Sequence, residues 1–268
     1  MTQSQALLSE PQSPPGASRQ QVLNAFQQLL LPERFKDYGP NGLQVEGRPL
    51  IRRMVSGVTA SRALIERAID AQADAIVVHH GLFWRGQTGS ITGWMKQRLS
   101  LLLAHDINLL AYHLPLDAHP WLGNNARLGQ LLGFQPPPGG DWGRFGEQDL
   151  GFTGMADFPG PQALARHVQS RLGRQVIWVG EPDRVIRRVG WCTGGAQGYF
   201  EAAIEAGVDA FLTGEMSEPQ AHYARESGVA FLACGHHATE RYGAPAVTAH
   251  VAEALGLEHV FIDVDNPA

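Results

Sequence analysis

Two pairs of adjacent histidines each follow an apolar run that is typical of a buried strand. The segment AIVVHHGLFW (75–84) contains His79 and His80, and FLACGHHATE (231–240) contains His236 and His237. Neutral imidazole is a common ligand of zinc and of other first-row divalent metals. Since the chain has 11 histidines, their positions matter more than their number, and these two strand ends are candidate metal-binding positions.

Carboxylates occur at similar strand ends. His113 and Asp117 lie in HLPLDAH, Glu215 in TGE, and Glu240 four residues after His236. In open α/β sheets, ligands bind beyond the carboxyl ends of the strands. Each residue alone has a structural explanation, such as a turn cap or a favourable charge in the first turn of a helix. Together, imidazoles and carboxylates would be costly to bury unpaired, whereas divalent cations would satisfy both.

The spacing within each motif favours two ions rather than one. Adjacent side chains of a strand point to opposite faces, so His79 and His80 cannot easily bind the same ion. Just beyond the strand end, each could bind one of two neighbouring ions. Residues four apart share one face of a helix, which would place His236 and Glu240 together.

Strands and helices that alternate along the chain must position these residues. An amphipathic helix is predicted over 19–32, and continuous apolar runs of the kind found in parallel strands alternate with helical patterns thereafter. The pattern indicates an α/β protein with two lobes and mainly parallel sheets flanked by helices. Strands are expected at 52–60, 73–80, 107–117, 185–195, 208–215, 229–237 and 259–264, and further helices at 61–72, 92–106, 196–207, 217–228 and 238–255.

The composition divides the chain of 268 residues into four parts. Residues 1–18 are rich in Gln, Ser and Pro and are expected to be a disordered leader. The first lobe is predicted at 19–134 and the second at 186–268. The Pro/Gly-rich segment GFQPPPGGDWGRFG opens a smaller insert, 135–185, which is expected to pack beside the second lobe.

Composition also excludes several classes of protein. The net charge is −5 and no basic run occurs, which argues against nucleic-acid binding. No secretory signal and no run of 18 apolar residues are visible, so we expect a cytoplasmic protein without a membrane span. The two cysteines, Cys192 and Cys234, are too few for a disulfide framework and are expected to be buried thiols.

Seven segments resemble one known family. They are DYGPNGLQVEG, GVTAS, AIVVHHGLFW, HLPLDAHPWLGNNARLG, WCTGGAQ, AFLTGE and GHHATERYG. They are similar to the dinuclear-metal-centre proteins known as GTP cyclohydrolase I type 2 homologues, or the Ngg-one-interacting-factor-three-like family. The resemblance runs from about residue 20 to the C-terminus.

The resemblance implies metal ligands at His79, His80, Asp117, His236 and Glu240, with Glu240 bridging the two ions. It also implies a metal site in the cleft between the two lobes and a ring-shaped homohexamer. It does not make His237 a ligand, because the family often has tyrosine there. The metals would be two divalent ions per chain, with zinc, iron and manganese all compatible with these ligands.

Two functions remain open at this stage. The first is a metal-dependent hydrolase acting on a nucleotide-like or other small substrate, with His113 as a candidate general acid or base or as a residue that supports the ligands. The family name suggests GTP, although the chain has no GxxxxGK[ST] phosphate-binding motif. The alternative is a non-enzymatic metal chaperone or store, which would use the same ligands. The family's second name suggests an interaction protein, but no interaction motif is visible.

Overall fold

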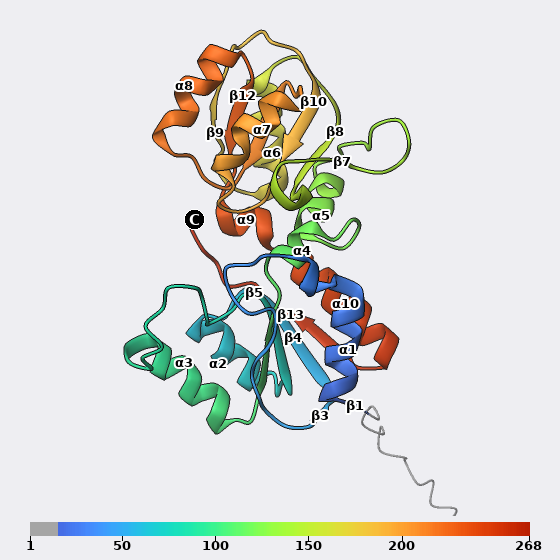
Figure 1. Cartoon of the computed structure of the whole chain (residues 1–268), viewed down its shortest axis with the longest axis vertical. Helices are drawn as coiled ribbons and strands as arrows, with labels where there is room; N and C mark the ends of the chain where they lie inside the picture. Colours follow the sequence, from blue (N-terminus) through green and yellow to red (C-terminus); the bar gives the residue numbers. More distant parts are fainter. Residues whose placement is uncertain (1–15) are drawn as a thin grey trace, which may run out of the picture.

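Two β-sheets, each flanked by helices, form two lobes of a mixed α/β protein (Figure 1). The structure is a computed structural model and describes residues 16–268. The predicted fold class of two α/β lobes is therefore confirmed. Of the predicted leader 1–18, residues 1–15 lie outside the described residues. Residues Ala17–Ser18 form the short strand β1, which pairs with β3 (Leu50–Ile51).

The first sheet has five strands in the order β13–β4–β5–β6–β2. Only β2 is antiparallel to its neighbour. Apolar side chains of α2 and α3 form a core on one face, and those of α1 and α10 form a core on the other. The strands are β2 (Gly42–Val45), β4 (Arg53–Thr59), β5 (Ala75–His80), β6 (Asn108–Ala111) and β13 (Glu258–Phe261); the helices are α1 (Arg19–Leu30), α2 (Arg62–Asp70), α3 (Gly93–Ala104) and α10 (Gly243–Leu255).

The second sheet has six strands in the order β7–β8–β10–β11–β12–β9. The three central strands are parallel, and the outer ones are antiparallel to them or to each other. Helices α5 and α6 pack on one face, and α7 and α8 on the other. The strands are β7 (Gly143–Phe145), β8 (Gly151–Phe158), β9 (Ile177–Val179), β10 (Ile186–Trp191), β11 (Ala210–Thr213) and β12 (Ala230–Ala233); the helices are α5 (Asn124–Leu131), α6 (Pro161–Leu172), α7 (Phe200–Glu205) and α8 (Glu218–Ser227).

The lobe boundaries differ from those assigned to the sequence. Residues 135–185 do not form a separate insert, because β7, β8 and β9 are strands of the second sheet itself. The chain also returns to the first lobe at its C-terminal end, where β13 pairs with β4. The reason is packing: Val247 and Val251 of α10 complete the core around Phe26 of α1. The second lobe therefore does not extend to residue 268.

The carboxyl ends of the parallel strands in both sheets face the region between the lobes. Two short helices, α4 (Leu114–Ala118) after β6 and α9 (His236–Glu240) after β12, lie in this region (Figure 1). The chain also forms 3-10 turns at Pro32–Arg34, Glu147–Asp149 and Gln197–Tyr199. No helix within 16–268 has the length and apolar character needed to cross a membrane.

Candidate metal centre

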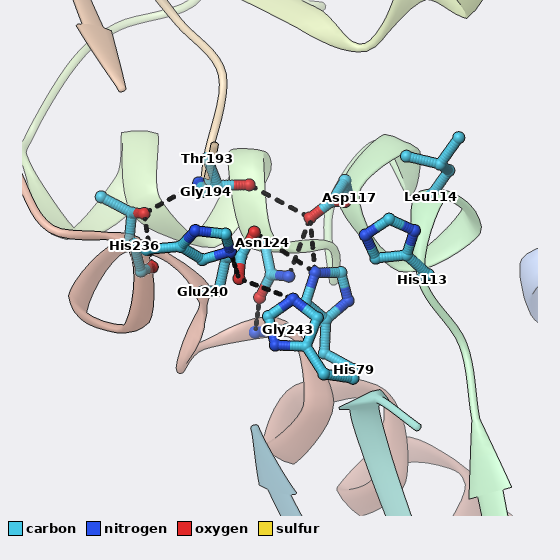
Figure 2. Close-up of polar contacts among 12 residues, drawn as sticks. His79, His113, Leu114, Asp117, Asn124, Thr193, Gly194, His236, Glu240 and Gly243 are labelled. Atoms are coloured by element: carbon cyan, nitrogen blue, oxygen red, sulfur yellow. Dashed lines mark hydrogen bonds and ion pairs between the residues drawn. The ribbon is translucent and has the colours of Figure 1, made fainter. Parts of the chain in front are cut away.

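The structure brings together all five ligands that were predicted from the sequence. His79 and His80 are the last residues of β5, Asp117 lies in α4, and His236 and Glu240 are the ends of α9. These residues, with His113, form three groups whose ligand atoms lie within 4.8 Å of one another: His79/His80/His113, His80/His236/Glu240 and His79/Asp117/Glu240. Figure 2 shows the labelled members pointing toward one another.

Glu240 is the residue that links these groups. Its Oε1 lies 3.4 Å from Nε2 of His79, and its Oε2 lies 3.2 Å from Nε2 of His80 and 3.0 Å from Nε2 of His236. Nε2 of His79 is in turn 3.6 Å from Oδ1 of Asp117. One carboxylate oxygen thus faces His79 and the other faces His80 and His236, an arrangement in which Glu240 can bridge two ions.

His79 and His80 at the end of β5 each make a hydrogen bond through Nδ1 to a residue that is not a candidate ligand. The ring of His79 donates from Nδ1 to the carbonyl oxygen of Tyr112 at 3.1 Å, and Nδ1 of His80 is hydrogen bonded to the Thr59 hydroxyl at 3.0 Å. In metalloproteins a ligating histidine usually binds such an outer partner through the nitrogen that does not face the metal. Both rings therefore present Nε2 to the centre of the site.

The other two histidines have carboxylates as outer partners. Nδ1 of His236 lies 2.6 Å from Oε1 of Glu215, and Nδ1 of His113 lies 2.7 Å from Oδ1 of Asp37. A carboxylate in this position fixes the ring orientation and makes the opposite nitrogen more basic. Glu215 therefore supports a ligand rather than being one of the clustered groups.

Two atoms at the centre of the site test whether metal ions fit there. Nε2 of His79 and Oε2 of Glu240 are both buried, and neither makes a contact of hydrogen-bond geometry within residues 16–268, although ion-pair partners lie 3.0–3.6 Å away. Buried polar groups without a partner are rare and destabilising. Because a cation would satisfy both the imidazole lone pair and the carboxylate oxygen, the residues present fit a metal centre.

Asp117 is oriented by two hydrogen bonds to one of its oxygens. Oδ1 accepts from Nδ2 of Asn124 at 2.9 Å and from the Thr193 hydroxyl at 3.1 Å. Asn124 also accepts, through Oδ1, from the backbone N–H of Gly243 at 2.8 Å (Figure 2). Asp117 is therefore held by side chains from α5 and from the loop after β10.

The loop after β10 approaches Glu240 so closely that it requires a glycine. Gly194 has φ of +70°, and a Cβ atom there would lie 1.9 Å from Oε1 of Glu240. Its N–H donates to the Thr239 hydroxyl at 3.0 Å. In the segment Thr193–Gly195, Gly194 thus allows both a left-handed backbone conformation and close packing against the carboxylate of Glu240.

The neighbouring charges and burial shift the pKa values of the three histidines in the metal-free site. Burial opposes a charged His79, but Asp117 and Glu240 outweigh it and raise its pKa to about 9. Burial likewise opposes a charged His236, yet Glu240 and Glu215 raise its pKa to about 9. Burial and the neighbouring His79 lower the pKa of His80 to about 4.

The two buried carboxylates shift in opposite directions. Burial favours the neutral form of both, but the surrounding histidines hold the pKa of Glu240 well below its usual value. Burial and the nearby charge of Glu240 raise the pKa of Asp117. Glu240 is therefore the more acidic of the two carboxyl groups in the metal-free site, and the histidines compensate its charge.

Comparison with known proteins decides the family. The family model described as Duf34/NIF3 (NGG1p interacting factor 3) matches residues 17–267. The chain belongs to the DUF34/NIF3 family. The resemblance seen in the sequence is thereby confirmed.

Relatives of this DUF34/NIF3 protein cover nearly its whole length. A Neisseria meningitidis serogroup A protein is 51% identical over 251 residues, which is 93% of this chain and 99% of the relative. A Pseudomonas aeruginosa protein is 52% identical over 236 residues, covering 88% and 92%. Both are named GTP cyclohydrolase 1 type 2 homolog. Among solved structures, the protein ybgI, whose description reads unknown function, is 46% identical in sequence to this chain. The two structures superpose with a TM-score of 0.86, and the match covers 94% of this chain and 100% of ybgI.

The other residues singled out in the sequence have different roles. His237 is turned away from the three groups, and its Nε2 lies 3.0 Å from Oδ1 of Asp263. Sequence reasoning missed Asp37, although the turn-rich segment DYGPNG that contains it is part of the family resemblance. Asp37 also accepts hydrogen bonds from Asn41 and from the N–H of Leu114, at 2.8 and 2.9 Å.

Cys234 is two residues from His236 and provides a test of the ligand set. It is buried, its thiol points to the carbonyl oxygen of Leu232 at 3.8 Å, and burial raises its pKa to about 12. A thiol that stays protonated is a poor metal ligand. We expect Cys234→Ser to keep the wild-type metal content while losing about 1–3 kcal/mol of stability, because a hydroxyl replaces a buried thiol.

Elemental analysis of the reconstituted variant, with urea unfolding, checks this expectation. Loss of one metal equivalent in Cys234→Ser would make Cys234 a ligand and would shift the expected metal toward zinc.

A cavity of about 360 Å³ opens beside the three groups of candidate ligands, which are called the metal groups below. Its walls come from both lobes. Lobe one contributes Tyr38, His80, Trp84, His113, Leu114 and Asp117, and lobe two contributes Glu147, Gln148, Leu150, Cys192, Thr193, Gly195, Ala196, Tyr199, His236 and Glu240. A volume of this size accommodates a small molecule next to the ligand atoms.

Proposed function

We propose that this DUF34/NIF3 protein is a hydrolase that uses two divalent metal ions and acts on a small molecule in the cleft between its lobes. The observation that carries the proposal is the convergence of five candidate ligands around Glu240, four of which also line the cavity: His80, Asp117, His236 and Glu240. The name GTP cyclohydrolase 1 type 2 homolog, which its relatives bear, supports hydrolysis as the type of reaction.

The proposed ligands divide between two ions that Glu240 bridges. His79 and Asp117 would bind one ion, and His80 and His236 the other, in line with the clustered groups. When bound, two such ions polarise an electrophilic bond and lower the pKa of water. The mixed imidazole and carboxylate set is compatible with zinc, iron or manganese.

His113 is the chain's own candidate for proton transfer. Burial works against a charged Asp37, but its hydrogen bond with His113 and the charge of that ring lower the Asp37 pKa to about 2. Asp37 is therefore ionised at neutral pH and accepts the Nδ1 proton of His113. The opposite nitrogen, Nε2, is the one left for proton transfer. This is the orientation that a general base needs.

Replacing His113 by alanine should lower turnover by about 100-fold while the metal content stays at the wild-type value, because general acid–base catalysis typically contributes that much. Asp37→Asn should produce a smaller loss of turnover, since the ring remains but its tautomer is no longer fixed. The test is to screen the zinc-, manganese- and iron-loaded protein against cyclic amides, nucleosides and phosphate esters, with metal analysis of every sample.

The outcomes separate the two functions that the ligands allow. Turnover that survives complete removal of metal by a chelator would contradict the proposed hydrolase. A fully loaded protein that turns over none of these substrates would favour metal storage or delivery instead. Loss of metal in His113→Ala would make His113 a ligand rather than a proton-transfer residue.

A further inference from the structure

Aromatic rings from both lobes form the walls of the cavity above the metal groups. Trp84 meets His113 edge-to-face at 5.0 Å between ring centroids, and Tyr38 lies 6.0 Å from the same ring. Tyr38 is 59% exposed, unusually high for so large a ring. From the second lobe, Tyr199 lines the cavity. Exposed rings at the entrance of a cavity are suited to stack against a flat ligand.

Hydrogen bonds join the two loops that carry Tyr38 and Trp84. The N–H of Arg85 donates to the carbonyl oxygen of Tyr38 at 2.6 Å, and the Arg85 guanidinium donates to the carbonyl oxygen of Asp37 at 2.8 Å. These bonds join the loop that carries Tyr38 to the loop that carries Trp84. A preformed wall loses little entropy when a ligand binds, which favours affinity.

A side chain of the second lobe fixes the width of the cleft near Tyr38. Gln148 accepts from the N–H of Lys36 at 2.7 Å and donates to the carbonyl oxygen of Lys36 at 3.3 Å. These two bonds hold the Gln148 amide against the backbone of Lys36. The Tyr199 hydroxyl is likewise held, since it donates to the carbonyl oxygen of Glu147 at 3.0 Å.

The charged side chains that line the cavity are all acidic or are histidines. Asp117 and Glu240 belong to the metal groups, and Glu147 adds a third carboxylate; the cavity's lining within 16–268 includes no lysine or arginine. Two divalent ions held here would keep a positive charge, because Asp117 and Glu240 balance only part of it. A chain of phosphates that extended past the ions would be repelled by Glu147, and the lining offers it no ammonium or guanidinium group.

We propose that the cleft binds an uncharged, flat nitrogen heterocycle that stacks on Trp84 and Tyr38 and directs N–H groups to Glu147, and that it discriminates against nucleoside triphosphates. This inference rests on the proposed function, whose substrate class it specifies. The ring supplies a face for the aromatic wall, and its N–H groups supply donors for Glu147, a lining carboxylate that is not a candidate metal ligand.

The experiment compares guanosine with GTP and adenosine with ATP on the zinc-loaded protein by isothermal titration calorimetry. Each nucleoside should bind at least about 10-fold more tightly than its triphosphate, because both offer the same base for stacking and only the triphosphate brings negative charge close to Glu147. Trp84→Ala should weaken nucleoside binding about 10-fold. Trp121→Ala is the matched control, because Trp121 is 57% exposed and does not line the cavity; it should bind as the wild type does.

A charge reversal at the entrance tests the electrostatic part. Glu147 is exposed, so Glu147→Lys should fold normally. It should tighten GTP binding about 10-fold or more through a new ion pair, and it should not improve guanosine binding. The inference is overturned if neither nucleoside binds more tightly than its triphosphate, or if Trp84→Ala and Trp121→Ala behave alike.

The proposed function and this inference fail in different ways. Nucleoside binding without turnover would retain the substrate class and remove the hydrolase. Metal-dependent hydrolysis of a triphosphate that binds better than its nucleoside would retain the hydrolase and remove the substrate class.

Discussion

Replacing Glu240 by glutamine should remove both metal ions, with the affinity for each falling by at least about 100-fold. Among residues 16–268, Glu240 is the only one whose carboxylate lies within 3.5 Å of three candidate ligand nitrogens, those of His79, His80 and His236. An amide keeps the shape but loses the negative charge and one of the two acceptor oxygens. Loss of an outer partner alone costs 10–100-fold in affinity, so loss of a bridging ligand should cost about the upper value or more.

The measurement is elemental analysis after zinc reconstitution, with chelator competition for the affinities. Glu218→Gln is a matched control, because Glu218 and His222 form an exposed His–Glu pair with the same four-residue spacing. That variant should retain the full metal content. His79→Ala should weaken mainly one ion. A Glu240→Gln protein that binds two ions with ordinary affinity would show that Glu240 is not the bridge.

Raising the pH from 6 to 8 should strengthen zinc binding by about 100-fold for each ion. His79 and His236 both have a pKa of about 9 in the metal-free protein, so each carries a proton that a metal must displace. Below this pKa, each proton released gives about a tenfold gain in affinity per pH unit. The direction of the effect follows from the raised pKa of His79 and His236. Zinc affinity increases with pH up to about 9, where both rings have lost the proton, and it falls progressively at lower pH.

Zinc-buffered competition titrations at several pH values measure this dependence, and calorimetry in two buffers of different ionisation enthalpy counts the protons. In Glu215→Gln the pKa of His236 should be lower, because one of the carboxylates that raise it is gone. One ion's affinity should then level off at a lower pH. Affinity that is constant above pH 7 in the wild type would contradict the proton count.

The sequence by itself was enough to predict the residues at the centre of the site: its local features gave the candidate positions, and its resemblance to a family gave the five expected ligands. Strand ends and ligand types are local features: an apolar run that stops at His79 and His80 is visible without a structure, and so is the four-residue spacing of His236 and Glu240. Because the carboxyl ends of parallel strands lie at one edge of a sheet, these local features also predict where the side chains gather.

The tertiary structure decided which residues support the ligands. Asp37 and His113 are 76 residues apart, and Thr193 reaches Asp117 across the same separation. No periodic pattern links such pairs, because their contact depends on how two loops from different strands pack. The rings of Tyr38 and Trp84 lie in separate loops, which the backbone bond between Arg85 and Tyr38 brings together.

The return of the C-terminal segment to the first lobe was also beyond the sequence. A helix followed by a strand reads the same whichever sheet it joins, and the assignment to 186–268 followed chain order. In the structure β13 extends the edge of the first sheet beside β4, and α10 covers the apolar face that α1 leaves incomplete. Local residues decide whether a segment forms a strand. Which strand it pairs with depends on the apolar surface that remains to be buried, and only the folded chain determines that surface.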